Sequence, residues 1–335
     1  MIRKWALGLG IASLALIQTP AFAQLPRSAT VATHAVGSLY NRIGTGIATV
    51  LSLHTPMTVR VQPFGGPPAW LPSMNQGNTD MGVLTGADAV TAYKGIVIYK
   101  KPFKNIRLLL VGGALQLGFY VRKDSPIKTI KDLKGKRVPT DFPGIPIVAL
   151  SSKAALASAG LSYKDIVHVP VSDLQAGNRA FIEGRTDVGW HALRSPAVKE
   201  ADARVGGVRF LSVNDTPQGA ARMAEVYPGS YPAIQKAGTA TGVLTDTALL
   251  NNDIYLVATK DFSDDAAYAV VKALWTNVKE LWAAQPALRS WRRARMVSTA
   301  AYIPYHPGAI RFYKEKGLWT KQMDELQAKL LAESK

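Results

Sequence analysis

The chain has 335 residues, with 40 lysines and arginines, 23 aspartates and glutamates, a formal net charge of +17 and no cysteine. That length can bury a substantial core and form two lobes or domains. The lack of cysteine excludes disulfides, cysteine-ligated metals, a thiol nucleophile and a lipid anchor on cysteine. The basic charge favours anionic ligands, and because no nucleic-acid-binding motif accompanies it, we expect no nucleic-acid partner.

Residues 1–23 have the three parts of a secretory signal peptide. Arg3 and Lys4 form a charged start, an apolar core follows, and Ala21-Phe22-Ala23 is an A-x-A cleavage site. The apolar core is too short to be a good membrane span. We therefore expect cleavage after Ala23 and export to the periplasm of a Gram-negative cell.

The first structural pattern is a strand, a turn and a helix. Val31-Ala32-Thr33 predicts a strand, His34 to Gly37 a turn, and Ser38 is a suitable N-cap. The apolar residues that follow recur at helical spacing: Leu39, Ile43, Ile47 and Val50. Such a turn points free backbone N–H groups at one spot, with the helix dipole behind them, and favours an anion such as a carboxylate. The same pattern also fits an ordinary strand–helix turn.

The next segments repeat this alternation. Residues 58–62 alternate as a strand does, Phe64 to Pro68 forms a turn, and a buried strand is predicted over residues 81–84. Between the turn and that strand, Trp70 begins an apolar helical stripe that continues through Leu71 and Met74. A β-α-β-α-β order with short loops indicates a parallel sheet flanked by helices.

In such sheets, ligands lie outside the carboxyl ends of the strands. The loops at those ends are residues 33–37, 64–68 and 85–87, and we expect them to converge. The candidate ligand-binding residues of this part of the chain are Thr33, His34, Gly37, Ser38, Tyr40, Gly66, Trp70, Thr85 and Gly86.

Two more strands are predicted farther along, Leu108 to Val111 and Leu117 to Val121, and the second carries the chain into a new lobe. Glycines and Gln116 interrupt this apolar stretch, which therefore predicts buried strand and not a membrane span. The residues that follow, 121–138, strongly resemble the start of the second lobe of type II periplasmic binding proteins. We expect a helix there, a stop at Gly135 and then a strand.

In the second lobe, the patterns predict helices over residues 148–159 and 176–182 and strands over 167–171 and 186–190. The end of the last strand, Trp190 to Leu193, should face the cleft between the lobes.

An alternating strand over residues 252–258 returns the chain to the first lobe, and Ser263 then begins a helix. Its predicted apolar face is Val270, Val271, Leu274, Val278, Leu281 and Trp282. We expect the hinge between the lobes near Gly118–Val121 and Asn252–Tyr255.

Several of these segments resemble the TAXI family of solute receptors that serve TRAP transporters. The family's T-G-S-x-G-G-x-Y-Y run matches at Thr33, Gly37 and Tyr40. Four family residues are replaced in the same run, by His34, Ala35, Ser38 and Asn41. Residues 65–71 resemble the family's G-G-S-x-E-N-L run in their glycines and Leu71, and Ala92-Tyr93-Lys94-Gly95 matches its A-Y-K-G.

The closest match lies near the C-terminus. Ile303 to Ala309 and Tyr313 to Leu318 resemble the family's I-P-x-H-P-G-A followed by Y-x-E-K-G. The matched segments run from about residue 31 to residue 319, which is nearly all of the mature chain. His306, between two prolines, is expected to be a structural turn residue.

The resemblance implies a two-lobed α/β clamshell of the type II periplasmic binding proteins, each lobe a mainly parallel sheet flanked by helices. Residues 24–119 and 254–335 would form the first lobe, and residues 120–253 the second. It also implies a monomer without cofactor or metal, which binds a small carboxylate such as glutamate or 2-oxoglutarate. The membrane subunits of a TRAP transporter would be its partners.

The family's loop over residues 139–146 is rich in glycine and serine and faces the ligand, so Phe142 and Gly144 join the candidate site, together with Trp190 and His191. Pro67, Pro68, Trp70 and Phe142 stand where the family has polar or small residues. The bulky residues Trp190 and His191 are expected nearby. This predicts an apolar, aromatic pocket for an aromatic or branched hydrophobic carboxylate in preference to glutamate. Arg42 or Arg194 would assist in holding the carboxylate.

Motifs for enzymatic chemistry are weak. Gly44-Thr45-Gly46 lacks the third glycine of a dinucleotide site, no P-loop or G-x-S-x-G elbow is present, and the five histidines form no H-E-x-x-H or close pair. Two alternatives to a TRAP receptor remain. One is a periplasmic hydrolase-like enzyme whose serine, histidine and aspartate come from distant segments. The other is a receptor for an ATP-driven transporter.

Overall fold

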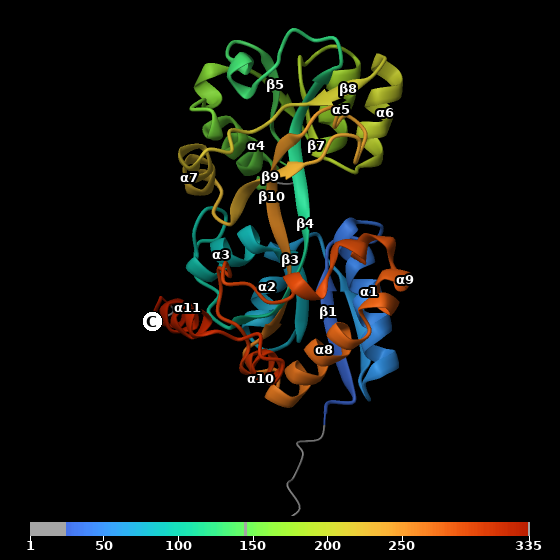
Figure 1. Cartoon of the computed structure of the whole chain (residues 1–335), viewed down its shortest axis with the longest axis vertical. Helices are drawn as coiled ribbons and strands as arrows, with labels where there is room; N and C mark the ends of the chain where they lie inside the picture. The colour runs from blue at the N-terminus through green and yellow to red at the C-terminus, as the bar shows by residue number, and fades with distance from the viewer. Residues whose placement is uncertain (1–24, 144–145, 334–335) are drawn as a thin grey trace, which may run out of the picture.

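The computed structural model describes residues 25–143 and 146–333, and Figure 1 shows two lobes of helices and strands joined by two long strands. The predicted signal peptide, residues 1–23, and the candidate site residue Gly144 lie outside the described residues. The predicted α/β class is confirmed, since sheets form the centre and helices flank them. No helix among the described residues is long and apolar enough to cross a bilayer.

The first lobe alternates strands and helices in the predicted order. Its elements are β1 (Ser28–Thr33), α1 (Leu39–His54), β2 (Thr58–Pro63), α2 (Pro67–Asn75), β3 (Met81–Thr85) and α3 (Gly86–Lys94). β1 lies between β2 and β3 and pairs with both in parallel. The carboxyl ends of all three strands therefore lie at one edge of the sheet.

Two long strands connect the lobes, β4 (Ile106–Arg122) and β10 (Thr247–Thr259). They pair antiparallel, from Ile106 opposite Thr259 to Leu117 opposite Leu250. β10 also pairs with β3 and so lies between β3 and β4 in the first lobe. Every antiparallel ladder among the described residues includes one of these two strands.

β4 is one continuous strand, whereas the sequence predicted two. The glycines that suggested an interruption instead let other side chains approach the strand. A Cβ on Gly112 would clash with the Trp291 ring, and a Cβ on Gly113 would clash with Ser290 Oγ. Larger residues cannot occupy these positions without moving their neighbours, so the glycines serve packing and not a turn.

The second lobe consists of the chain between the two crossing strands. Its elements are η1 (Ile130–Leu133), β5 (Arg137–Asp141), α4 (Pro146–Ser158), η2 (Tyr163–Asp165), β6 (Val167–Val171), α5 (Leu174–Ile182), β7 (Gly189–Ala192), α6 (Pro196–Val205), β8 (Val208–Phe210), α7 (Pro217–Val226) and β9 (Ser230–Gln235). β5 pairs with β6 in parallel, β7 and β8 pair with β4, and β9 pairs with β10. The helix predicted before Gly135 is a single 3-10 turn.

The chain then packs helices on the first lobe. These elements are α8 (Asp264–Thr276), α9 (Val278–Ala284), η3 (Pro286–Ser290), η4 (Arg293–Arg295), α10 (Pro307–Glu315) and α11 (Lys321–Ala332). Ser263 caps α8 as predicted, because its Oγ accepts from Ala266 N at 3.2 Å. The apolar stripe predicted as one helix is divided at Asn277. His306 has the predicted structural role, because it caps α10 by accepting from Gly308 N at 3.2 Å.

The buried apolar side chains form separate clusters in the two lobes. On β4, Val111 belongs to the first-lobe cluster and Leu117 to a second-lobe cluster, while Leu115 packs against both. On β10 the change falls between Leu250 and Ile254. The two cores therefore meet along the middle of β4 and β10.

Candidate functional site

The loops that follow β1, β2 and β3 meet at one edge of the first lobe. Because the three strands are parallel, the chain leaves the sheet on the same side after each of them. The backbone N–H of Phe64 donates to the carbonyl of Thr33 at 3.1 Å and holds the first two loops together. The N–H of Ala87 donates to Asn252 Oδ1 on β10 at 3.1 Å. The sequence prediction that these loops converge is confirmed.

Side-chain hydrogen bonds order the turn before α1. Ser38 Oγ caps the helix by accepting from Asn41 N at 3.1 Å, and Asn41 Nδ2 donates to Thr33 Oγ1 at 3.2 Å. Thr33 is fully buried, and its hydroxyl donates to the next carbonyl along the chain at 2.9 Å. The N–H groups of Leu39 and Tyr40, at the start of the helix, have no acceptor within the helix. They are therefore directed toward the edge where the loops meet.

The outer part of this turn, Val36 and Gly37, is exposed, and the positive charge of Arg42 lies beside it. Val36 is 78% exposed, and Gly37 has a φ of 83°, a conformation that favours glycine. Arg42 Nη1 donates to the carbonyl of Gly37 at 2.6 Å. Its guanidinium thus lies beside the helix start and adds to the positive end of the helix dipole. This arrangement attracts an anion.

The starts of α2 and α3 offer fewer donors. Pro67 and Pro68 occupy the first two positions of α2 and have no N–H. In α3, Asp88 N donates to Thr85 Oγ1 at 2.9 Å, and Ala87 N is already bonded to a side chain of β10. Of these three helix starts, α1 is therefore the one best suited to hold an anion.

Glycines allow close approach at the same edge. Gly66, with a φ of 150°, is the N-cap residue of α2. A Cβ on Gly86 would lie 3.0 Å from Tyr255 Cζ, so the glycine lets β10 approach α3. A Cβ on Gly229 would lie 3.0 Å from Ala87 N. The turn between α7 and β9 of the second lobe therefore lies against the start of α3.

His34 and Tyr40 form a stacked pair beside the turn, with ring centroids 4.0 Å apart. Burial lowers the pKa of His34 to about 4, so its imidazole is neutral near pH 7. Its Nε2 is buried and has no hydrogen-bond partner among residues 25–143 and 146–333. An unpaired imidazole nitrogen can still make a hydrogen bond, and because it is buried a ligand reaches it only after its neighbours move.

Sequence reasoning missed a buried polar cluster at the start of α3. Asp88 is 4% exposed, and its Oδ2 accepts from Thr85 Oγ1 at 2.7 Å. Burial raises the pKa of Asp88 to about 6, although its hydrogen bonds with Thr85 oppose the rise. Tyr40, Tyr99 and Tyr227 all interact electrostatically with Asp88. The spacing Thr85-x-x-Asp88 is a capping-box pattern that marks a helix start, but no pattern of this kind points to the tyrosines.

Three aromatic residues expected at the cleft lie in the cores of the lobes. Trp70 has no exposed surface, and a Cβ on Gly82 would lie 2.5 Å from its ring. Phe142 is also fully buried, at a φ of 48°. Trp190 is 1% exposed, with its ring centroid 4.6 Å from that of Phe119. All three side chains pack the interior, so the prediction that they form an aromatic pocket wall loses its support.

A hydrolase needs a serine whose proton a histidine can accept. His191 Nε2 lies 3.4 Å from Ser195 Oγ, but His191 Nδ1 accepts from Ala192 N at 2.9 Å. The hydrogen of the neutral ring is therefore on Nε2, which donates toward the serine and cannot act as its base. Burial lowers the pKa of His191 to about 4, which keeps the ring neutral. Ser195 itself caps α6 by accepting from Ala197 N at 3.0 Å.

Within residues 25–143 and 146–333, no group of three or more histidines, aspartates and glutamates is arranged to hold a metal ion.

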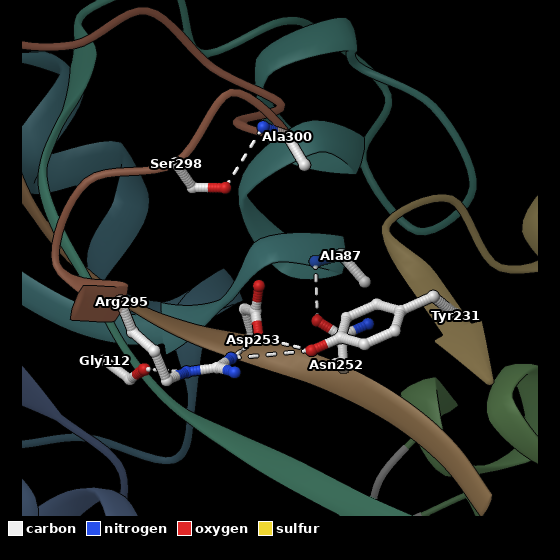
Figure 2. A network of polar contacts seen from close by, with 8 residues as sticks. All are labelled: Ala87, Gly112, Tyr231, Asn252, Asp253, Arg295, Ser298 and Ala300. Atoms are coloured by element: carbon white, nitrogen blue, oxygen red, sulfur yellow. Dashed lines mark hydrogen bonds and ion pairs between the residues drawn. The ribbon is translucent and has the colours of Figure 1, made fainter. Parts of the chain in front are cut away.

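A polar network lies where the strands cross between the lobes (Figure 2). Asp253 Oδ1, on β10, accepts from Arg295 Nη2 at 2.5 Å and from the Tyr231 hydroxyl at 2.7 Å. Arg295 Nε also donates to the carbonyl of Gly112 on β4 at 3.2 Å. The network joins β4, β9, β10 and η4 and fixes the position of the crossing.

The predicted site residues thus fall into two groups. Those that the structure gathers at the edge of the first-lobe sheet are Thr33, His34, Gly37, Ser38, Tyr40, Gly66, Thr85 and Gly86. Trp190 and His191 lie on β7, opposite Phe119 and Gly118 of β4. Arg194, considered as a second base for the anion, donates to Gln116 Oε1 at 2.6 Å. Trp70 and Phe142 remain inside the lobes.

Comparison with known proteins adds a family and a fold. A model of the NMT1-like family matches residues 31–317. A TctC solute binding protein from Polaromonas shares 14% identity and a TM-score of 0.55, over 78% of this chain and 88% of that one. The periplasmic sulfonate-binding protein SsuA of a putative sulfonate ABC transporter from Methylobacillus flagellatus shares 18% identity and a TM-score of 0.51, over 92% and 94%.

A Xanthomonas citri protein solved with bound ATP is similar at 12% identity and a TM-score of 0.52, over 92% of this chain and 98% of that one. At these identities the likeness is one of fold. Two of the three neighbours bear the name of a solute- or sulfonate-binding protein.

Proposed function

We propose that this chain, which belongs to the NMT1-like family, is a secreted solute receptor that binds a small organic anion between its two lobes and delivers it to a membrane transporter. The observation that carries the proposal is the start of α1. There an ordered turn, two N–H groups without an intrahelical acceptor and the guanidinium of Arg42 meet at the carboxyl edge of a parallel sheet. The predicted signal peptide and the periplasmic binding-protein fold support secretion.

The anion is a carboxylate in this proposal. A carboxylate can accept from the N–H groups of Leu39 and Tyr40 while the helix dipole stabilises its charge. His34, neutral and with Nε2 unpaired, can supply one further hydrogen bond. The protein's basic composition would favour the approach of such a ligand.

We also propose an apolar or aromatic body for the ligand. Because Trp70, Phe142 and Trp190 are interior residues, this preference now depends on other groups. Val36 is exposed at the crest of the first turn, and Phe64 is half-buried in the second loop. Both lie at the edge where the anion would sit, and apolar surface there favours an apolar ligand.

For the transporter, we propose the TRAP type and the TAXI subfamily within it. The support is the C-terminal run from Ile303 to Leu318, where the resemblance to that subfamily is strongest. A receptor for an ATP-driven transporter remains the alternative, and one structural neighbour bears such a name. The receptor acts as a monomer without a cofactor, and by hinge motion between its lobes.

Thermal unfolding with a panel of organic acids tests the proposal. A ligand present at about 100 times its dissociation constant should add roughly 2.7 kcal/mol to the free energy of unfolding. Mass spectrometry of the incubated acids separates a receptor from an enzyme, because a receptor returns its ligand unchanged. If no acid shifts the melting temperature, or if the stabilising acid is consumed, the proposal is wrong.

A further inference from the structure

The loop that follows α3 exposes three apolar residues in a row. Ile96 is 39% exposed, Val97 54% and Ile98 36%, and we call these three residues the apolar tip. Among the large hydrophobic side chains that are exposed in the described part of the chain, no other three are consecutive in sequence. Single exposed apolar residues are common on protein surfaces, whereas a contiguous group is typical of a surface that contacts another molecule or a membrane.

The backbone of the apolar tip is strained. The N–H of Tyr99 donates to the carbonyl of Ile96 at 3.2 Å and closes a turn in which Val97 and Ile98 are the central residues. Val97 has a φ of 64°. Glycine, asparagine or aspartate usually occupies such a position, and a β-branched residue there costs stability. The chain thus keeps an apolar side chain where a polar residue or glycine would fit the backbone better.

The base of the loop is anchored to the first lobe. The N–H of Phe103 donates to the carbonyl of Ala92 on α3 at 2.9 Å. A Cβ on Gly95 would lie 2.5 Å from Pro102 N, so the two ends of the loop touch. The rings of Tyr99 and Phe103 are both buried and pack edge to face, with centroids 5.7 Å apart. The apolar tip is therefore held outward by a closed loop that its own side chains pack.

Lysines surround the apolar tip. No aspartate or glutamate occurs in residues 89–123. Lys94, at the end of α3, pairs with Glu333 at 3.1 Å. Lys100 and Lys101 directly follow the tip and are exposed, and neither forms an ion pair or hydrogen bond with any residue in the described ranges. Two positive charges beside the tip are thus free to contact an anionic partner.

We propose that this loop docks the protein on the surface of a bilayer that contains anionic lipids. The apolar tip enters the headgroup region, and Lys100 and Lys101 contact the anionic headgroups. Peripheral binding needs both buried apolar area and electrostatic attraction, and the loop supplies the two together. Lysine suits a fluid lipid surface, because its ammonium is a point charge on a flexible stem and requires no fixed geometry.

A second copy of the chain fits this surface less well. Two tips that met face to face would bring Lys100 and Lys101 of each copy together, and like charges across an interface oppose association. The three side chains of the tip are also aliphatic, whereas protein interfaces are enriched in aromatic residues and arginine. Charge complementarity therefore favours the anionic bilayer.

The inference goes beyond the proposed function, since docking on lipid needs no bound solute. A receptor held at a bilayer surface would meet a membrane transporter by diffusion in two dimensions. Docking and solute binding involve different residues and can be tested separately.

Sedimentation with lipid vesicles tests the inference. The vesicles are phosphatidylcholine, either pure or with about one quarter phosphatidylglycerol, and the wild-type protein should sediment with the anionic vesicles only. Val97→Asn removes the apolar side chain and should weaken this binding about 3- to 10-fold. Lys100→Gln combined with Lys101→Gln removes two charges and should weaken it about 10- to 30-fold.

Matched variants in the second lobe serve as controls. Val167→Asn changes a similarly exposed valine, 49% exposed on β6. Lys131→Gln combined with Lys134→Gln removes two exposed lysines at η1 and lowers the net charge by the same amount. Both controls should bind anionic vesicles as the wild type does.

Thermal melts separate lipid binding from stability. Asparagine adopts a positive φ more readily than valine, so Val97→Asn should melt at or above the wild-type temperature. A variant that loses vesicle binding without losing stability identifies a contact with lipid and not a role in folding. The loop variants should also keep the stabilisation by an organic acid.

A fluorescent label locates the contact. The chain has no cysteine, so Ile98→Cys supplies a single attachment site for a dye that responds to the polarity around it. The dye emission should shift to shorter wavelength on anionic vesicles. The same dye attached through Val167→Cys should show no shift.

Three results would overturn the inference and leave the proposed receptor function intact. The first is that the wild-type protein does not sediment with anionic vesicles. The second is that the loop variants bind these vesicles as the wild type does, or lose no more binding than their controls. The third is a wild-type dimer that Val97→Asn converts to a monomer, because the tip would then join two copies. If docking depends on the loop but no organic acid stabilises the protein, the proposed function is wrong and the inference stands.

Discussion

The guanidinium of Arg295 lies 2.5 Å from the carboxylate of Asp253, where the crossing strands run between the lobes (Figure 2). Arg295 belongs to the segment that packs on the first lobe, and it also bonds the backbone of β4. Asp253 shares the same oxygen with Tyr231 of β9. One carboxylate thus ties the first-lobe segment to a second-lobe strand, and the pair should restrict the angle between the lobes.

We expect Asp253→Asn to loosen this restriction. The neutral amide keeps an oxygen for Tyr231 but loses the ion pair, so the free energy of unfolding should fall by about 1–3 kcal/mol. The radius of gyration in solution scattering should rise without ligand and fall toward the wild-type value at saturating ligand. Asp246→Asn, which breaks an exposed pair with Lys236, should change neither quantity. If the scattering curves of Asp253→Asn are identical to those of the wild type, the Asp253–Arg295 pair does not restrict the angle between the lobes.

Gly37→Pro should abolish ligand binding. The residue has a φ of 83°, which proline cannot adopt, so the turn that orders the start of α1 must rearrange. Gly135→Pro is the matched control, because Gly135 has a φ of 71° and a Cβ added there, as at Gly37, would meet no atom within 4 Å. It should cost stability but not affinity. A folded Gly37→Pro protein with wild-type affinity would show that the anion binds elsewhere.

The contribution of the buried histidines to stability should fall as the pH drops from about 6.5 to 4. Burial lowers the pKa of both His34 and His191 to about 4, below the usual value near 6.5. The unfolded chain therefore takes up protons first, and each histidine removes on the order of 1–3 kcal/mol across that interval and none above it. His34→Gln and His191→Gln should each flatten the decline in thermal melts. His168→Gln, at an exposed histidine, should leave it unchanged.

Asp88→Asn should stabilise the ligand-free protein at pH 8. Burial raises the pKa of Asp88 to about 6, so the folded protein carries a penalty for the charged carboxylate above that pH. The amide removes the penalty and should add about 1–3 kcal/mol to the free energy of unfolding. Near pH 4 the wild-type carboxyl is itself neutral, and the difference should vanish. A variant less stable than wild type at both pH values would indicate a purely structural Asp88.

Trp70→Ala should affect stability and not ligand affinity. Its indole is fully buried against Gly82, and removing a buried tryptophan costs about 3–5 kcal/mol. Affinity measured on the folded fraction should match wild type within error. Phe64→Ala, at a half-buried residue beside the anion site, should weaken the binding of an apolar acid and cost less stability than Trp70→Ala. If Trp70→Ala instead weakens ligand binding and Phe64→Ala does not, Trp70 contacts the ligand.

Local sequence signals predicted much of the first lobe. Ser38 and Ser263 start helices because short hydroxyl side chains cap them, and both caps are confirmed. The parallel order of β1, β2 and β3, and the convergence of their loops, follow from short connections and alternating patterns. These features depend on neighbours in the chain, which is why a single sequence suffices.

The errors arose from contacts between distant segments. Gly112 and Gly113 suggested a break in β4 because nothing local shows that Trp291 and Ser290 pack on them. Trp70 is apolar, and the sequence alone does not show whether an apolar residue faces a ligand or packs in the core. The burial of Asp88 escaped notice because much of its surroundings comes from segments distant in the sequence. In all three cases the outcome depends on which distant residues pack against the position in the folded protein.

The position of β10 has a consequence for how the protein forms. The whole second lobe is an insertion between two strands that pair side by side, and β10 lies between β3 and β4 in the first-lobe sheet. An emerging chain that has reached Arg122 already holds four strands of this sheet but lacks the one between them. The N-terminal part cannot close its core until residues 247–259 arrive. The first-lobe sheet therefore cannot be completed before the residues of the inserted lobe have been synthesised.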